Sequence, residues 1–434
     1  MNSLKLGICG LGTVGAGTFN VLRRNIHDIN ARAGTSIEVT QVGMRRDNPA
    51  CDLTGISTTN DIFEVAENPD VDVLVELIGG TTTARDLVMK AIANGKHVVT
   101  ANKALIALHG NEIFEAAEQQ GVAVHYEAAV AGGIPIIQTM REGLVANQIE
   151  WLVGIINGTG NFILSEMFDK GADFESVLKQ AQELGYAEAD PTFDVEGIDA
   201  AHKLTILAAL AFGIPLQFDK VFTEGITNIQ LQDVNYAREL GYRIKHLGIA
   251  RKGADGIELR VHPALVSSRQ LLANVNGVMN AVMVQGDAVG PTLYYGAGAG
   301  AEPTASAVIS DIVDLARTLF MEPEYRVAHL GFNAVKPNCP MVLDISESES
   351  ASYLRVMVAD KPGGLASIMT IMAQQGMDIE AVIQKEPEPG QFHVPVILLT
   401  DKSKEKNTLE AISRIEALEQ VEGPVVRIRV ESLS

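Results

Sequence analysis

Carboxylates and a lysine are concentrated in the segment from Ala181 to Lys203, which reads AQELGYAEADPTFDVEGIDAAHK. Lys203 begins the run KLTILAALAF, which is apolar on nearly every face and therefore predicts a buried helix. Burial disfavours the charged form of a lysine, so it lowers the pKa and lets the amine exchange a proton near neutral pH. Asp199 precedes Lys203 by four residues, on the same helical face. The segment predicts either a proton-transfer site or a structural Asp-Lys pair.

A glycine-rich turn near the N-terminus predicts dinucleotide binding. An apolar strand pattern from Leu4 to Cys9 comes before it, and an amphipathic helical pattern follows. Glycines in a G-x-G-x-x-G turn let the backbone approach a pyrophosphate, which rests on the helix N-terminus. A purely structural turn is the alternative, but the strand-turn-helix context favours the nucleotide. The motif consists of Gly10, Leu11, Gly12, Thr13, Val14 and Gly15.

The end of the second predicted strand, Ile37 to Met44, bears on the choice of cofactor. Arg45 and Arg46 follow that strand, at the position where an acidic residue would bind a ribose 2′-hydroxyl. Arginine there accommodates a 2′-phosphate, so the sequence favours NADP. Asp47 comes next in the chain, and because its carboxylate could bind a ribose 2′-hydroxyl, NAD remains the alternative cofactor.

Lys103 follows another predicted strand, His97 to Thr100, at the sheet edge where open α/β folds bind ligands. This position predicts catalysis or substrate binding rather than an ordinary surface lysine. Further along, Glu127 lies in an irregular, glycine-rich segment that ends at Pro135. One carboxylate among free backbone carbonyls is a plausible nest for a monovalent cation, with a helix-capping glutamate as the alternative.

Composition excludes several classes of function. The formal net charge is −20, and the basic residues form only pairs, which argues against nucleic-acid or anionic-membrane partners. The three cysteines, Cys9, Cys51 and Cys339, are scattered without a CxxC motif, as in reducing compartments. No signal peptide or transmembrane run is recognisable, so we expect a cytoplasmic protein.

The length of 434 residues predicts two or three domains, in an α/β fold. Residues 1–130 predict a Rossmann-type doubly wound parallel sheet, and residues 131–336 an α+β substrate domain whose last helices return to the first. After a linker at 337–350, residues 351–434 follow a ferredoxin-like βαββαβ order. We expect this last unit to be separable, since the others should contain their own cores.

Over essentially its whole length the chain resembles homoserine dehydrogenase. The motifs that carry the resemblance are the glycine turn, ANK at Ala101 to Lys103, the Glu127 loop, NGTGNFILSEM from Asn157, the block from Ala181 to Lys203, and YYGAGAGAEPTASAV from Tyr294. One departure is Gly160, where the family more often has threonine. The C-terminal unit resembles the amino-acid-sensing ACT domains, with a structural dimerisation module as the alternative.

The resemblance implies a role for individual residues. Lys203 would donate and accept the proton with help from Lys103, and the middle domain would bind homoserine and form a dimer. Substrate would be held by Gly185, Glu188 and Asp199. The nucleotide would contact Leu11, Thr13, Val14, Arg45, Lys103 and Gly300. A sodium ion would be bound by Glu127 and by the carbonyls of Val130, Gly132 and Ile134.

The activity implied is reversible NAD(P)-dependent reduction of L-aspartate 4-semialdehyde to L-homoserine, in threonine, methionine and isoleucine biosynthesis. The ACT resemblance implies feedback by threonine, and the family implies a homodimer or homotetramer. Another amino-acid dehydrogenase would lack the block from Ala181 to Lys203, and a noncatalytic sensor would lack Lys203 and Lys103. The strand starting at Leu4 leaves no room for a preceding aspartokinase, so we expect no such fusion.

Overall fold

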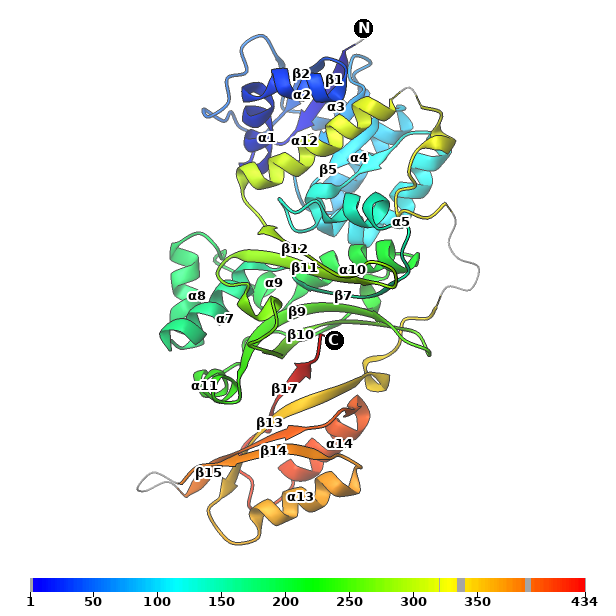
Figure 1. The fold of residues 1–434 in the computed structure, drawn as a ribbon. Coiled ribbons are helices and arrows are strands. Elements are labelled where there is room, and N and C mark those ends of the chain that lie inside the picture. The colour runs from blue at the N-terminus through cyan, green and yellow to red at the C-terminus, as the bar shows by residue number, and fades with distance from the viewer. Residues whose placement is uncertain (1–2, 320, 334–339, 387–391, 434) are drawn as a thin grey trace.

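The computed structural model describes residues 3–319, 321–333, 340–386 and 392–433. Cys339 and the first residues of the expected linker lie outside these ranges. Three units follow one another along the molecule, with the N-terminal unit at one end and the C-terminal unit at the other (Figure 1). Among the described residues, no helix is both long and apolar enough to cross a membrane.

The N-terminal unit is a six-stranded parallel sheet with the strand order β3-β2-β1-β4-β5-β6. This is the order of dinucleotide-binding Rossmann folds, as predicted. Its central strands β4 and β5 are buried throughout, which explains their uninterrupted apolar sequences. The strands are β1 (Leu4–Cys9), β2 (Ile37–Gly43), β3 (Ser57–Thr59), β4 (Val73–Glu76), β5 (His97–Thr100) and β6 (Val124–His125). The helices are α1 (Thr13–Arg24), α2 (Ile26–Ala33), α3 (Ile62–Glu67), α4 (Thr82–Ala93) and α5 (Lys103–Gln120).

A short connection leads into the middle unit through η1 (Glu127–Ala129), α6 (Ile136–Gln138) and η2 (Thr139–Gly143). The strands of the middle unit are β7 (Ile149–Ile155), β8 (Phe222–Thr223), β9 (Tyr242–Lys252), β10 (Ile257–Ser267), β11 (Met279–Gly286) and β12 (Gly290–Ala297). Its helices are α7 (Gly158–Lys170), α8 (Phe174–Glu183), α9 (Thr192–Val195), α10 (Ile198–Phe212), α11 (Leu231–Glu239) and α12 (Ala301–Thr318). Short helical turns are η3 (Phe218–Lys220), η4 (Leu272–Asn274), η5 (Pro323–Tyr325) and η6 (Ile345–Glu347).

Helix α12 returns to the N-terminal unit and lies beside α1 (Figure 1). The approach is so close that a Cβ atom on Gly17 would lie 2.5 Å from the carbonyl oxygen of Ala301. Apolar side chains of α12, among them Val308 and Ile312, belong to the same buried cluster as Leu22 of α1. Helix α12, which follows the last strand of the middle unit, thus packs into the core of the N-terminal unit.

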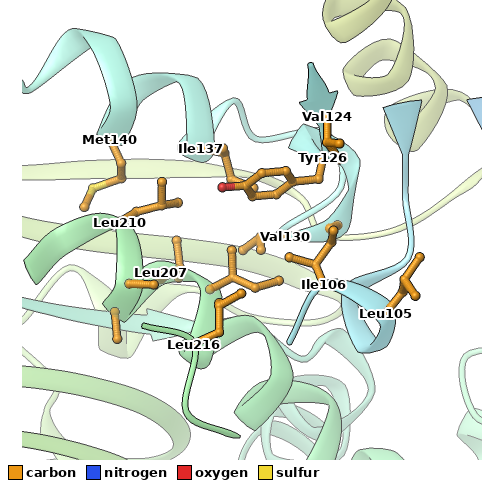
Figure 2. Packing of buried hydrophobic residues seen from close by; sticks show 14 of the residues in the cluster. Leu105, Ile106, Val124, Tyr126, Val130, Ile137, Met140, Leu207, Leu210 and Leu216 are labelled. Atoms are coloured by element: carbon orange, nitrogen blue, oxygen red, sulfur yellow. The ribbon is translucent and has the colours of Figure 1, made fainter. Parts of the chain in front are cut away.

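Helix α10 is buried along its length, from Asp199 to Phe212, as its sequence predicts. One face packs against the N-terminal unit, where Leu207 and Leu210 share a cluster with Ile106 of α5 and with Val130 (Figure 2). This packing places the beginnings of α10 and α5 close together.

The C-terminal unit has the predicted βαββαβ order. It consists of β13 (Glu349–Ala359), α13 (Gly364–Gln374), β14 (Ile379–Gln384), β15 (His393–Thr400), β16 (Ser403–Lys404), α14 (Glu405–Glu416) and β17 (Val426–Glu431). Its four main strands lie in the order β17-β13-β15-β14, which is the ferredoxin-like arrangement. Both helices lie on one side of this sheet (Figure 1).

The C-terminal unit is not separate from the middle unit. Strand β17 pairs in parallel with β10, so one eleven-stranded sheet runs through both units. Their cores also merge, because Tyr353 and Ile428 pack in one cluster with Leu265 of β10. The expectation of wholly separate cores is wrong, since sequence patterns identify each strand but not its neighbour across a unit boundary.

Candidate active site

The glycine turn joins β1 to α1, and each glycine of the motif has its own surroundings. Gly10 has φ +98°, and a Cβ atom there would lie 2.6 Å from the carbonyl oxygen of Leu77. A Cβ atom on Gly15 would clash with the carbonyl oxygen of Gly10, so this glycine allows the helix to pack close to the turn. Gly12 has open space around it. Of the three glycines of the motif, only Gly12 thus has free space beside it for a ligand.

The N-terminus of α1 is suited to an anion. Gly12 is its N-cap and supplies no side-chain cap, and the first turn contains no acidic residue. Its amide groups can therefore bind the pyrophosphate of a dinucleotide. Nearby, Asn48 Nδ2 donates a hydrogen bond of 2.8 Å to the carbonyl of Leu11, which ties the loop after β2 to the glycine turn. Arg45 begins that loop and is exposed.

Lys203 is buried on α10, with 8% of its surface exposed. Its Nζ atom donates a hydrogen bond of 2.6 Å to the carbonyl of Ile156 and one of 2.7 Å to Asp199 Oδ2. Burial lowers the pKa of Lys203, Asp199 opposes this effect, and the positive charge of Lys103 adds to it. The Lys203 amine therefore loses its proton at a lower pH than the amine of a solvated lysine does.

Asp199 joins the two lysines that the sequence singled out. Its Oδ1 atom lies 3.1 Å from Lys103 Nζ, at the start of α5, while Oδ2 faces Lys203. Burial alone would raise the pKa of Asp199, but the two ammonium groups outweigh it and hold that pKa below the usual range. The carboxylate is thus ionised, and it links the N-terminal unit to the middle unit.

Asn157 was not predicted as part of this cluster. Its Nδ2 atom donates hydrogen bonds of 2.8 Å to Asp194 Oδ1 and 2.9 Å to Asp199 Oδ2. Its Oδ1 atom accepts the N–H of Gly160 at 2.7 Å, which caps α7. Asn157 is therefore the N-cap of α7. The glycine at position 160, where the family more often has threonine, donates this capping bond through its backbone N–H. An asparagine before a helix was the available signal, but it pointed only to a cap.

One cavity of about 550 Å³ opens over this cluster, between the N-terminal and middle units. It brings together more than half of the predicted site residues. Those lining it are Thr13, Val14, Lys103, Gly132, Gly185, Glu188, Asp199, Lys203 and Gly300. Asp194, Asn157, Thr159 and Tyr186 also line it and were not predicted as ligand contacts. The lining does not include Gly10, Leu11, Gly12, Gly15, Arg45, Glu127, Val130 or Ile134.

Glu127 is buried and precedes Ala128, which lines this cavity. Its two carboxylate oxygens accept the backbone N–H groups of Ile137, at 2.9 Å, and Gln138, at 2.7 Å. The carboxylate therefore caps the start of α6, and each of its oxygens keeps a further lone pair for another partner. Burial, reinforced by neighbouring Asp311, raises the pKa of Glu127 to about 7. Within the described part of the chain, no group of three or more His, Cys, Asp or Glu side chains is arranged to hold a metal ion.

Comparison with known families divides the chain into three matching regions. Residues 10–127 match the family described as "Homoserine dehydrogenase, NAD binding domain". Residues 135–313 match the family "Homoserine dehydrogenase", and residues 352–419 match the ACT domain.

Whole-chain relatives agree with this division. The homoserine dehydrogenase of Pseudomonas aeruginosa is 63% identical over 434 residues, with 100% of both chains covered. That of Neisseria gonorrhoeae is 52% identical, again with full coverage. A crystal structure of a homoserine dehydrogenase from Thiobacillus denitrificans superposes with a TM-score of 0.94 at 57% identity, covering 100% of this chain and 99% of the other. The chain therefore belongs to the homoserine dehydrogenase family of NAD(P)-dependent oxidoreductases, which act on a CH–OH group, and it carries an ACT domain.

Proposed function

We propose that Lys203 is the proton donor and acceptor when homoserine and aspartate 4-semialdehyde are interconverted, and that Lys103 assists it. The observation that carries this proposal is the Lys203-Asp199-Lys103 cluster in the cavity beside the glycine turn, in which Lys203 and Asp199 are buried and Lys103 is partly exposed. In homoserine oxidation, neutral Lys203 takes the hydroxyl proton. In the reverse direction, the Lys203 ammonium returns a proton to the carbonyl oxygen. A bound nicotinamide supplies or accepts the hydride.

Asp199 and Glu188 hold the substrate, and the backbone of Gly185 contributes to its binding. Both carboxylates line the cavity and suit the α-ammonium group of homoserine. Asp194 extends this acidic surface. Because Asn157 binds Asp194 and Asp199 at the same time, it fixes the two carboxylates relative to each other.

The cofactor is NADP in preference to NAD. The pyrophosphate binds at the uncapped start of α1, where Gly12 has open space, with Leu11, Thr13, Val14 and Gly300 around the nucleotide. Arg45 and Arg46 supply positive charge at the end of β2 for a 2′-phosphate. In the ranges that the structure describes, neither guanidinium has an ion-pair partner in the protein, so both are available to a ligand.

Replacing Arg45 by alanine is expected to lower the affinity for NADP by roughly ten-fold or more, because a charge-assisted hydrogen bond contributes about 1.5–3 kcal/mol. The affinity for NAD should change little, since NAD has no 2′-phosphate. Fluorescence titration of both reduced cofactors measures the two affinities. Arg32, an exposed arginine on α2, provides the control as Arg32→Ala. Equal losses for NADP and NAD would show that Arg45 does not bind the phosphate.

Replacing Asp199 by asparagine should weaken homoserine binding and also move the pH profile. The raising effect of Asp199 on the pKa of Lys203 is lost, so that pKa falls further. Oxidation of homoserine needs the neutral amine of Lys203. The rise of the oxidation rate on the acidic side of its pH profile should therefore move to lower pH. Steady-state kinetics in the oxidative direction across pH give KM and the position of this rise. An unchanged position with unchanged KM would remove Asp199 from the site.

We also propose a sodium ion at Glu127 and the carbonyls of Val130, Gly132 and Ile134. A buried carboxylate with a raised pKa, next to a second acid at Asp311, favours a nearby cation. The consecutive left-handed residues Ala131 (φ +56°) and Gly132 (φ +50°) give this loop a fixed, non-repetitive shape, as a carbonyl-based site requires. Comparing activity in sodium chloride and in choline chloride tests this assignment.

The enzyme is proposed to be a cytoplasmic homodimer or homotetramer. Cys9 and Cys51 are both buried and free, as in a reducing compartment. Strand β12 is an edge strand of the large sheet, and Tyr295 on it is 58% exposed, which suits pairing with a second copy. Light scattering of the purified protein measures the oligomeric state.

Threonine is proposed as a feedback inhibitor that acts through the ACT domain, within the biosynthesis of threonine, methionine and isoleucine. Homoserine-dependent reduction of NADP and NAD, followed by absorbance with and without threonine, tests the activity, the cofactor preference and the feedback together. Allosteric coupling of about 1–3 kcal/mol predicts a threonine effect on homoserine affinity of roughly five-fold or more. Equal kinetics with and without threonine would contradict the feedback role.

A further inference from the structure

A second cavity of about 550 Å³ lies at the junction between the middle unit and the ACT domain, and we call it the junction cavity. One wall consists of the segment from Phe222 to Gln230 together with Pro263 of β10. The opposite wall consists of α14 and the beginning of β17. Its volume falls within the range of pockets that bind small molecules.

The junction cavity is lined by two arginines and two glutamates. Arg427 makes a bidentate ion pair with Glu405, at 2.6 and 2.8 Å. Arg429 bridges Glu405, at 2.5 Å, and Glu224 of the middle unit, at 2.6 Å. Because the formal charges of these four groups cancel, a ligand with a net charge would leave an excess charge in the cavity. A zwitterion leaves the net charge at zero, and its two charged groups can pair with a glutamate and an arginine.

The cavity also has an apolar side. Leu409 and Ile412 of α14 line it together with Ile229 and Pro263 of the middle unit. Leu409 remains 51% exposed, although its helix packs its other apolar residues inward. An aliphatic side chain in the cavity would cover this leucine. Charges of both signs beside an aliphatic surface match the chemistry of a small neutral α-amino acid.

The wall that carries Glu224 also contacts the substrate segment. The N–H of Ile226 donates a hydrogen bond of 2.8 Å to the carbonyl of Val195, and Thr227 Oγ1 donates one of 3.0 Å to Glu196 Oε1. A Cβ atom on Gly225 would lie 2.8 Å from the Val195 carbonyl oxygen, so the two segments are in close contact. Val195 directly follows Asp194, which lines the active-site cavity.

We propose that the junction cavity binds a small neutral α-amino acid, and that its occupant acts on the active site by moving the segment from Glu224 to Thr227 against Val195 and Glu196. The ammonium group of the ligand pairs with Glu224, and its carboxylate pairs with Arg427 and Arg429. This inference rests on the proposed feedback function and assigns it a site. Tight contacts between the two segments transmit a shift, because packed interfaces have few intermediate arrangements.

The test uses the full-length enzyme with L-threonine, L-isoleucine and L-methionine as probes. Calorimetric binding and inhibition of homoserine oxidation are measured for the wild type and four variants. Leu409→Trp fills the cavity from an exposed position, and Glu224→Gln removes the ammonium partner without changing shape. Glu410→Trp is the matched control, exposed on the same helix but outside the cavity lining. The loop from Asp360 to Gly364 leads into α13, whose uncapped first N–H groups are a second place where the ACT domain could bind the carboxylate of an amino acid. Ala366→Glu places an anion in this first turn and should block that alternative site.

We expect Leu409→Trp and Glu224→Gln to weaken amino-acid binding at least ten-fold, while Glu410→Trp and Ala366→Glu bind as the wild type does. Binding that survives in both cavity variants and is lost in Ala366→Glu would overturn the junction site but leave the feedback function standing. Binding of isoleucine or methionine that depends on Leu409 would support the site and contradict threonine as the effector. If none of the three probes binds the wild type, both the site and the feedback function fail.

Discussion

Replacement of Lys203 by alanine is expected to lower turnover by about two to four orders of magnitude, the span that a general acid-base group contributes. The nucleotide affinity should stay nearly unchanged, because the glycine turn belongs to another unit and does not contact this side chain. The variant should also fold. Asp199 loses one cationic partner but keeps Lys103 at 3.1 Å and Asn157 at 2.9 Å, so no buried carboxylate is left without a partner.

The chain contains a matched control for this variant. Lys245 is as deeply buried as Lys203, and burial lowers its pKa to about 7. Its Nζ atom donates to the carbonyl of Val275 at 2.6 Å and to Asn161 Oδ1 at 3.2 Å, away from the active-site cavity. Lys245→Met should therefore affect stability and leave the chemical step in place. Single-turnover kinetics at saturating cofactor separate the two cases, and turnover near the wild-type value in Lys203→Ala would refute its assignment.

The sequence predicts those parts of the site that depend on short distances along the chain. Asp199 and Lys203 are four residues apart, and the buried helix that carries them follows from its apolar sequence. The glycine turn is likewise contained within one strand-turn-helix unit. For such features, spacing fixes geometry, and the structure agrees with the prediction.

Contacts between distant segments could not be predicted in this way. Asn157 binds Asp194 and Asp199, which are 37 and 42 residues further along the chain. Its sequence context shows only a polar turn. A single asparagine leaves no repeating pattern in the sequence from which its hydrogen-bond partners could be predicted. Whether Lys103 meets Asp199 depends on how α10 packs against α5, and that packing involves many apolar contacts spread over both units.

The junction of the ACT domain is the largest difference between expectation and structure. Amphipathic patterns identify β17 and its inward-facing residues, but they do not show that its second edge pairs with β10. Nor do they show that Arg429 meets Glu224, which lies 205 residues away. A truncation before the ACT domain would therefore expose the edge of β10 and part of a shared core.

A buried ion pair gives a sharper test of this junction than truncation does. Arg355 on β13 binds Asp233 on α11 through Nε, at 2.7 Å, and Nη2, at 3.1 Å. Asp233 has no exposed surface, and Arg355 is 6% exposed. Removing one partner of such a pair leaves a buried charge that the remaining hydrogen bonds do not neutralise.

Arg355→Met is therefore expected to destabilise the junction by about 3–5 kcal/mol. Tyr353 Oη still donates to Asp233 at 3.0 Å, so the carboxylate keeps one side-chain donor but no positive charge. Native-state hydrogen exchange measures the effect in β10, β13 and β17 separately, which matters because a chain of several units does not unfold in one step. Exchange in α1 and β1, at the far end of the molecule, should remain as in the wild type.

Lys385 provides the control, because it forms an ion pair of 2.6 Å with Glu239 across the same junction but on the exposed surface. Lys385→Met should leave the exchange of all three strands nearly unchanged, since solvent screens such pairs. The double variant Asp233→Leu/Arg355→Met removes both buried charges, so it should recover part of the loss and retain the cost of the missing α11 cap. Equal exchange in Arg355→Met and Lys385→Met would mean that the buried pair does not hold the two units together, and that the β10-β17 pairing and the shared apolar core do so alone.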